Sequence, residues 1–173
     1  MEITLRRIKL EDTAALSAIS KKTFYDTFTG TCTPADMDLF LEESFNEVIV
    51  ANELSDPHDF YFFAEVNHQH VGYIRFKEDY SNLPLMKQWK AIELKRIYVL
   101  KEFHGKGIAQ KLMDFIIDFC IKEKYEVIWL GVWQHNLRAQ KFYEKYGFVN
   151  SGHNHDFPIG NTPQTDNWMW RFL

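Results

Sequence analysis

The sequence predicts an α/β fold built on a mixed sheet, and three segments carry this prediction. Residues 91–113 combine a strand pattern, a glycine-containing turn and the first turns of an amphipathic helix. Residues 127–133 are almost continuously apolar, which is typical of a strand buried on both faces. Residues 60–76 place two apolar runs around a polar turn, which predicts an antiparallel hairpin. The sheet should therefore join this hairpin to a parallel pair formed by residues 91–100 and 127–133.

The N-terminal part of the chain predicts one strand followed by helices. Apolar residues within positions 3–8 indicate the first strand, and residues 13–28 have apolar side chains at helical spacing. Thr33 followed by Pro34 predicts the start of a second helix, because threonine caps helices and proline suits the first helical position. Further helical turns are expected over residues 46–54.

The C-terminal part predicts a short helix and two strands. Asn136 can cap a helix that Gly147 ends in a left-handed conformation. A strand begins at residues 148–149, residues 153–164 are expected to be loop-rich, and residues 167–173 alternate as a last strand. The predicted order is β-α-α-β-β-β-α-β-α-β-β, with seven strands and about four helices.

Composition limits the classes of partner. A chain of 173 residues with 46% hydrophobic residues suits a single domain, residues 1–173. The formal net charge of −4 argues against nucleic acid as a partner and permits a cationic substrate. No basic-then-apolar leader or long apolar span is present, and Cys32 and Cys120 make no disulfide framework. We therefore expect a cytoplasmic protein with no membrane partner.

The turn after residues 91–100 has the features of an anion site. Gly105 and Gly107 allow a sharp turn and a close approach of the backbone to a ligand. The helix that follows presents unpaired N–H groups, and Lys106 and Lys111 add positive charge. A phosphate or pyrophosphate is expected here, and the alternative is a turn that only joins a strand to a helix.

Two motifs resemble those of the GNAT N-acetyltransferase superfamily. The segment His104-Gly-Lys-Gly107-Ile-Ala109 is similar to the GNAT pyrophosphate loop, with His104 in place of the usual glutamine or arginine. Asn136 and the run from Leu137 to Phe148 match the second GNAT signature, Asn-x-x-Ala-x-x-Phe-Tyr-x-x-x-Gly-Phe. Shorter segments, including Gln164-Thr-Asp166, resemble PaiA-type spermidine/spermine N-acetyltransferases.

The resemblance implies an α/β (α+β GNAT-type) fold whose sheet is centrally splayed, with acetyl-CoA as cosubstrate. The backbone of the splayed strand would hold the pantetheine arm, the loop and helix start would hold the pyrophosphate, and two further side chains would contact the cofactor. In this sequence the implied cofactor residues are Ile97, Tyr98, Val99, His104, Gly105, Lys106, Gly107, Ile108, Ala109, Gln110, Asn136 and Lys145. The histidine pairs at positions 68 and 70 and at 153 and 155 lack a complete set of metal ligands, so no metal is expected.

Tyr143 is the predicted proton donor to the departing thiolate, the role that the family assigns to the matching tyrosine. It lies seven residues after Asn136, so both side chains should face one groove. The alternative is a core aromatic residue. Glu93 is the predicted general base, by resemblance to acids that GNAT enzymes place on this strand, and its alternative is an ion-paired strand residue.

Tyr25 and Phe28 are predicted to wall the amine pocket, with core packing as the alternative. The predicted reaction is direct acetyl transfer to a primary amine of a polyamine or similar small cation. The alternatives are another amine, such as a protein N-terminus, an aminoglycoside or an amino acid, and a non-catalytic acetyl-CoA-binding regulatory module. Trp168 and Trp170, expected to be exposed on the last strand, suggest an interface and hence a homodimer.

Overall fold

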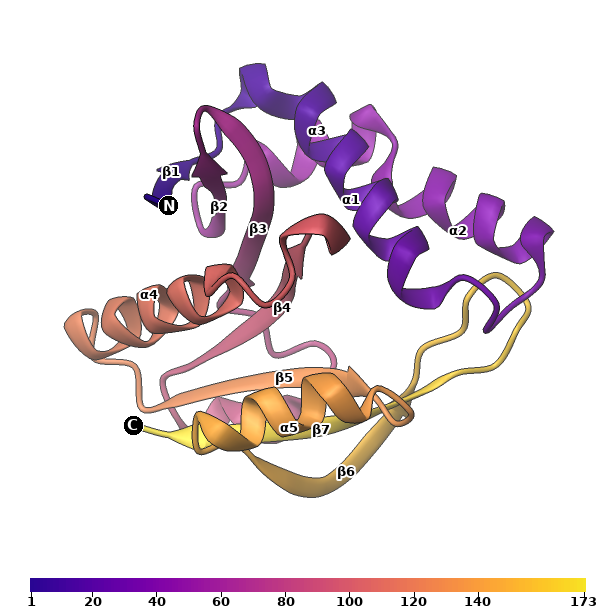
Figure 1. The fold of residues 1–173 in the computed structure, drawn as a ribbon. Coiled ribbons are helices and arrows are strands. Elements are labelled where there is room, and N and C mark those ends of the chain that lie inside the picture. The colour runs from indigo at the N-terminus through magenta and orange to yellow at the C-terminus, as the bar shows by residue number, and fades with distance from the viewer.

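The computed structural model describes residues 1–173 and contains one seven-stranded sheet in the order β1-β2-β3-β4-β5-β7-β6 (Figure 1). The strands are β1 Thr4–Arg7, β2 Asp59–Val66, β3 Gln69–Lys77, β4 Ala91–Val99, β5 Val127–Trp133, β6 Val149–Asp156 and β7 Thr165–Phe172. The helices are α1 Thr13–Phe28, α2 Pro34–Phe45, α3 Glu47–Leu54, α4 Ile108–Lys122 and α5 Leu137–Lys145. The predicted order of elements is confirmed, and residues 47–54 form a separate helix.

The sheet opens between β4 and β5. These strands are parallel neighbours only over residues 91–93 and 127–129, and beyond Glu93 and Trp129 they have no further pairing. A register shift on the other edge of β4, between Arg75 and Phe76 of β3, leaves Lys95 as an extra residue. Such a bulge bends a strand and increases its twist. The central splay expected from the resemblance is therefore present.

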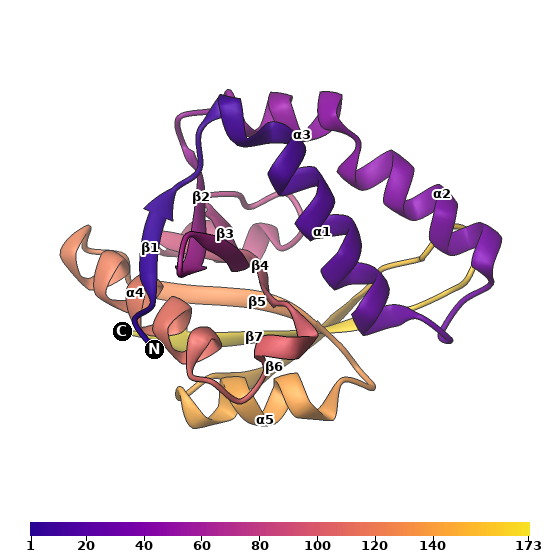
Figure 2. The same ribbon diagram turned by 45° about the horizontal axis from the view of Figure 1, so that its top comes forward.

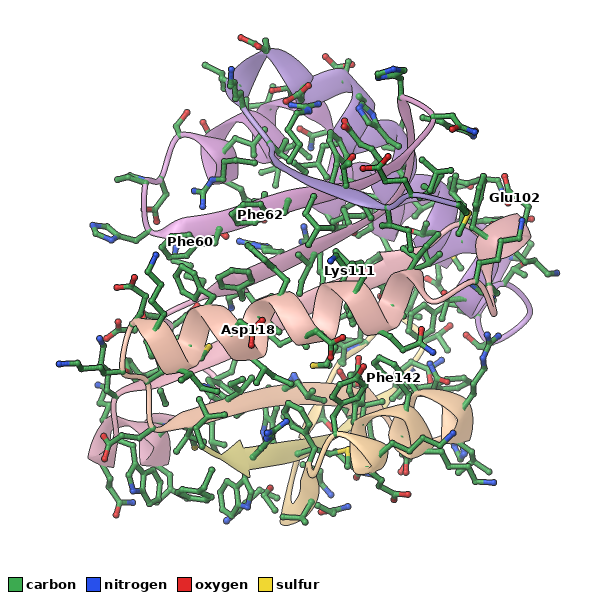
Figure 3. The ribbon with its side chains drawn as sticks, turned by 60° about the vertical axis from the view of Figure 1, so that its left-hand side comes forward. Phe60, Phe62, Glu102, Lys111, Asp118 and Phe142 are labelled. Atoms are coloured by element: carbon green, nitrogen blue, oxygen red, sulfur yellow. The ribbon has the colours of Figure 1, made fainter.

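Helices cover both faces of the sheet (Figures 1 and 2). On one face α4 packs its apolar side, including Leu112 and Ile116, against the central strands, and Tyr143 of α5 belongs to the same core. Phe60 and Phe62 of β2 lie beside α4 at its outer edge (Figure 3). On the other face α1 and α3 pack against aromatic residues of β2 and β3. Each face thus has a core of its own, and the opening of the sheet lies between them.

Local capping explains where the helices begin and end. The Thr33 side chain accepts a hydrogen bond from the Asp36 N–H, and Asn136 accepts one from the Ala139 N–H, as the sequence predicts. Gly147 follows α5 with a φ of 80°. The start of α2 and both ends of α5 are therefore determined by local sequence.

Two expectations about the C-terminal strands are wrong. Residues 153–156 are part of β6, because a register shift between Asn150 and Asn154 lets pairing with β7 resume after an interruption. Strand β7 is not an edge strand, since it lies between β5 and β6. Trp168 is consequently buried, at 2% exposure, and Trp170 is half-buried. The prediction that both tryptophans are exposed is therefore wrong, and the homodimer stays a prediction.

Candidate active site

A groove of about 520 Å³ lies where β4 and β5 separate. Its walls come from β4, β5, the starts of α4 and α5, and the last turns of α1. Because neither strand pairs with the other beyond Glu93 and Trp129, backbone N–H and C=O groups on the two facing edges are free for a ligand. The groove therefore offers polar backbone along walls that combine apolar and polar side chains.

The end of the groove at α4 is suited to a phosphate. Gly105 and Gly107 have φ angles of 76° and 83°, and neither has a protein atom where a Cβ would stand. The helix begins at Ile108, and its first backbone N–H groups have no intrahelical partner. Lys101 and Arg138 also line this part of the groove. Open backbone, a helix N-terminus and two cations together favour an anion.

His104 fastens the loop to β4. Its Nε2 lies 2.8 Å from the Val99 carbonyl oxygen, and its Nδ1 lies 3.2 Å from Arg138 Nη1. One tautomer satisfies both contacts, with Nε2–H as the donor and Nδ1 as the acceptor. The Leu100 N–H donates to Val71 on the β3 side, so by strand alternation Val99 directs its backbone toward the groove. His104 thus orders the loop and one groove-facing carbonyl at the same time.

Tyr143 and Asn136 both line the groove from α5. Tyr143 is buried, at 8% exposure, and packs edge-on against Phe142 and Phe148. Burial, followed by the nearby negative charge of Asp166, raises the pKa of Tyr143, so the phenol is protonated at neutral pH. The Asn136 carbonyl caps α5, which leaves its NH₂ group without a protein partner. A proton donor and an amide donor therefore face the same groove.

A second cavity of about 430 Å³ adjoins the groove. The two share the side chains of Lys95, Arg96, Tyr98, Phe157 and Asp166, together with Gly131. Aromatic rings of α1, α2 and β7 line the second cavity, as does the connection between β6 and β7. A ligand bound in the groove and a second ligand bound in the adjoining cavity would therefore meet at this shared wall.

Asp166 is the carboxylate at the shared wall. It is 9% exposed, and its Oδ1 atom is buried without a hydrogen-bond partner. The space for its side chain exists because Gly131 has none: a Cβ there would lie 3.2 Å from Asp166 Oδ2 and 2.8 Å from the Trp168 ring. Burial raises the pKa of Asp166 to about 7.

The connection between β6 and β7 is held against α2, and Figure 1 shows it reaching the junction of α1 and α2. Asp36 accepts hydrogen bonds from the Asn161 N–H at 2.8 Å and from the Thr162 hydroxyl at 2.7 Å. Gln164 accepts a hydrogen bond from the Trp133 indole and donates one to the Thr31 carbonyl. The far wall of the second cavity is thereby fixed to the N-terminal helices.

The structure brings most predicted cofactor residues into the groove. Those that line it are Ile97, Tyr98, Val99, His104, Gly105, Gly107, Ile108, Ala109, Gln110 and Asn136. Lys106 does not line it, because its ammonium group lies over the Phe103 ring at 4.6 Å. Lys145 is also outside, since it is exposed at the far end of α5 from Asn136. The predicted phosphate contact of the Lys145 side chain is therefore not supported.

Of the residues predicted to bind or deprotonate the amine, some line the groove and others do not. Phe28 lines the groove, but Tyr25 is 48% exposed and lines neither cavity. Tyr25 follows Phe24, which is buried, and one helical step rotates a side chain by about 100°, so it faces solvent. Its prediction as a pocket residue is wrong. Glu93 lines the second cavity rather than the groove, and Lys95 Nζ lies 2.8 Å from its carboxylate.

Sequence reasoning assigned no site role to Arg138 or to Asp166, although Asp166 belongs to the segment Gln164-Thr-Asp166 that resembles PaiA-type enzymes. Arg138 lies in the first turn of α5, two residues after the cap, so its place beside the groove could have been inferred from the signature. Asp166 reaches the shared wall only through the β5–β7 register, in which it is opposite Trp133. No local pattern in the sequence indicates that register.

Comparison with known proteins identifies the family. The model of the acetyltransferase (GNAT) family matches residues 21–148, which include β4, α4, β5 and α5. The chain belongs to the GNAT acetyltransferase family. This GNAT chain is also 32% identical over 164 residues to an uncharacterized N-acetyltransferase of Lactobacillus delbrueckii subsp. lactis, covering 95% of this chain and 94% of the relative. It is an acetyl-CoA-dependent N-acetyltransferase.

Solved structures share the GNAT fold. The PaiA N-acetyltransferase from Thermoplasma acidophilum, in complex with coenzyme A, aligns over the full length of both chains with a TM-score of 0.80 and 20% identity. The ribosomal-protein-S18-alanine N-acetyltransferase from Escherichia coli aligns with a TM-score of 0.74 and 17% identity, covering 99% of this chain and 94% of that one. The predicted fold class is confirmed.

The residues of the groove fit acetyl-CoA. The open glycine backbone and the start of α4 suit its pyrophosphate, and the free strand edges suit the amide-bearing pantetheine arm. Acetyl-CoA supplies the activated acetyl group. No group of three or more acidic, histidine or cysteine side chains is placed to hold a metal ion. None of the helices has the length and apolar character needed to cross a membrane.

Proposed function

We propose that the enzyme acetylates a primary amine of a polyamine such as spermidine or spermine, or of a similar small cation, by direct transfer. The observation that carries the proposal is the charge of the second cavity. The three basic side chains that line it are each paired with an acid, namely Arg75 with Asp59, Lys95 with Glu93, and Arg96 with Glu53. Asp156 and Asp166 also line it, and none of these three basic side chains pairs with either of them. An unpaired carboxylate pair favours a cationic acceptor.

The apolar walls of the second cavity support the same substrate class. Aromatic rings contribute Phe24, Phe40, Phe45, Phe157 and Trp168. Such rings attract ammonium groups through their faces and accommodate the methylene chains between them. The short motifs similar to PaiA-type spermidine/spermine N-acetyltransferases agree with this choice.

The proposed chemistry needs no acetyl-enzyme intermediate. The neutral amine attacks the thioester carbonyl, the carbon–sulfur bond breaks, and Tyr143 gives its proton to the departing thiolate. Burial raises the pKa of Tyr143, but the same desolvation also raises the pKa of a thiol in the groove. In water a phenol has a pKa near ~10 and a thiol a pKa near ~8.5, so the two groups are close enough in acidity for the transfer.

Free thiol released from acetyl-CoA, measured with spermidine, spermine, lysine and a peptide side by side, tests the proposal. We expect the two polyamines to give kcat/KM values well above those of lysine and the peptide. Equal rates for all four acceptors would remove the polyamine assignment. A clear preference for the peptide or for lysine would replace it with that amine class.

A further inference from the structure

The carboxylate of Asp166 lies at the boundary between the two cavities. It lines both the groove that contains Tyr143 and the second cavity, and its buried Oδ1 atom has no partner in the protein. An unpaired buried carboxylate is costly, and a fold retains one only where another requirement favours it. A cationic substrate group beside the partly accessible carboxylate would offset this cost.

We propose that Asp166 takes the proton from the ammonium group of the acceptor at the wall shared by the two cavities. The inference rests on the proposed function, because it concerns how a charged amine becomes a nucleophile at this site. A protonated amine has no lone pair for attack, so a base within hydrogen-bond reach of the nitrogen is needed. Asp166 lies where an amine in the second cavity would meet the donor in the groove.

Glu93, the base expected from the sequence, is less suited to this role. Its carboxylate is paired with Lys95 at 2.8 Å, and Glu93 does not line the groove that holds Tyr143. Asp166 has neither limitation. The titratable and charged groups that share its cavities are Asp26 on α1, Arg75 on β3, Glu93, Lys95, Arg96 and Tyr98 on β4, Lys101 and His104 between β4 and α4, Arg138 and Tyr143 on α5, and His155 and Asp156 on β6. None of them forms an ion pair or a hydrogen bond with it.

Asp166 and Tyr143 together account for every proton transfer in the reaction. One N–H proton of the ammonium passes to the Asp166 carboxylate, and the freed lone pair forms the new carbon–nitrogen bond. When the carbon–sulfur bond breaks, the thiolate takes the Tyr143 proton, and the phenolate recovers a proton from the acylated nitrogen. Asp166 then releases its proton to solvent. The net products are the acetamide, coenzyme A as free thiol, and one proton.

The two side chains are also coupled. The negative charge of Asp166 contributes to the raised pKa of Tyr143, and this contribution disappears once Asp166 is protonated. Removal of the ammonium proton therefore makes the phenol a better acid at the step where the thiolate must be protonated. With its pKa near 7, Asp166 can both accept and release a proton at neutral pH.

The test is the pH dependence of kcat/KM for spermidine from pH 6 to pH 9.5. The wild-type profile should rise through an apparent pKa near that of Asp166 in the free enzyme. Asp166→Asn should lose that limb and about 10²-fold or more of the rate at pH 7. Its deficit should narrow toward pH 9.5, where more of an amine with a pKa near ~10.4 is already neutral. Calorimetry should show unchanged acetyl-CoA affinity.

Two further variants sharpen the comparison. Glu93→Gln should keep the limb, and Asp118→Asn, which removes a carboxylate from the exposed face of α4, should match wild type (Figure 3). If Asp166→Asn fails to bind acetyl-CoA, Asp166→Ala is assayed with added formate, which should restore turnover in proportion to its concentration.

Retention of the limb and rate by Asp166→Asn, loss of the limb in Glu93→Gln alone, or no rescue by formate would each overturn the proposal. If wild type prefers lysine or the peptide, the polyamine assignment fails by itself, and the same profiles measured with that amine decide the role of Asp166.

Discussion

Burial raises the pKa of both Tyr143 and Asp166, but the consequence for the protonation state at pH 7 differs between them. The phenol is neutral at pH 7, so desolvation only strengthens a protonation state that it already has. The carboxyl is ordinarily charged at neutral pH, and desolvation raises its pKa to about 7. One residue is therefore kept as an acid, and the other becomes able to exchange protons.

Replacement of Tyr143 by phenylalanine removes the proton donor and little else, because the ring packs through its faces and edges. We expect kcat to fall by about 10²–10⁴-fold, the usual contribution of a positioned general acid. The Kd for acetyl-CoA, measured by calorimetry, should stay within a few-fold of wild type. Tyr25→Phe is the control, since Tyr25 is exposed and lines neither cavity. A Tyr143→Phe enzyme with full turnover would assign the proton to another donor.

Asp166 should also make stability depend on pH. Its pKa is near 7 in the folded chain and about 3.9 in the unfolded chain, so between these values the folded chain binds more protons. The free energy of unfolding must then fall as pH rises, by on the order of 4 kcal/mol in total. Asp166→Asn removes this penalty.

The measurement is urea denaturation of wild type and Asp166→Asn at two pH values. The variant should be more stable than wild type at pH 8, by less than the full penalty because its amide also lacks partners. At pH 4 the two proteins should differ little or the order should reverse. A variant that is less stable than wild type at pH 8 would contradict the raised pKa.

At the scale of elements, the connection between β6 and β7 determines the shape of the acceptor side. Phe157 and Pro158 line the second cavity, and the following residues are held by Asp36 of α2. A Cβ on Gly160 would lie 2.5 Å from Asp36 Oδ1, and the φ of Gly160 is 56°. The Asp36 carboxylate therefore packs directly on the Gly160 backbone, and only glycine leaves room for this contact between α2 and the connection.

Disruption of this contact from either side should have the same effect. Asp36→Ala removes the acceptor of both hydrogen bonds from the connection and of a third from the Thr33 hydroxyl, and Gly160→Ala introduces a methyl group where the carboxylate lies. We expect both variants to raise the KM for spermidine several-fold and to leave the Kd for acetyl-CoA unchanged. Hydrogen exchange of residues 157–164 should accelerate in both. Equal effects on the two substrates would indicate a general loss of structure instead.

At the scale of the whole molecule, the net charge of −4 and the unpaired acids of the second cavity favour the approach of a cation. A polyamine with several charges should respond to salt more strongly than an acceptor with one. We therefore expect kcat/KM for spermidine to fall as ionic strength rises from about 10 mM to about 150 mM, where the Debye length shortens from ~30 Å to ~8 Å. A monoamine measured in parallel should change less. Identical salt dependence for the two would argue against electrostatic attraction.

The sequence predicted the fold and the donor side of the site better than the acceptor side. The glycine turn, the Asn136 cap and Tyr143 belong to contiguous motifs, so their relative positions follow from local geometry. The acceptor side depends on contacts between distant segments, such as the register that places Asp166 opposite Trp133. The strand pairing that buried Trp168 is likewise a product of tertiary packing, whereas the outward position of Tyr25 follows from its place beside the buried Phe24 on the helix.

The separation of β4 from β5 also affects how long the folded enzyme lasts. Beyond Glu93 and Trp129, the backbone N–H and C=O groups on the facing edges of the two strands do not bond to each other, so they need partners from a ligand or from water. A bound donor molecule supplies partners that the chain itself lacks, and such a ligand stabilises the native state by an amount that grows with the logarithm of its free concentration above Kd. A cell short of activated acetyl groups would therefore hold this protein in its least heat-resistant form, and abundance of the donor would preserve the catalyst that consumes it.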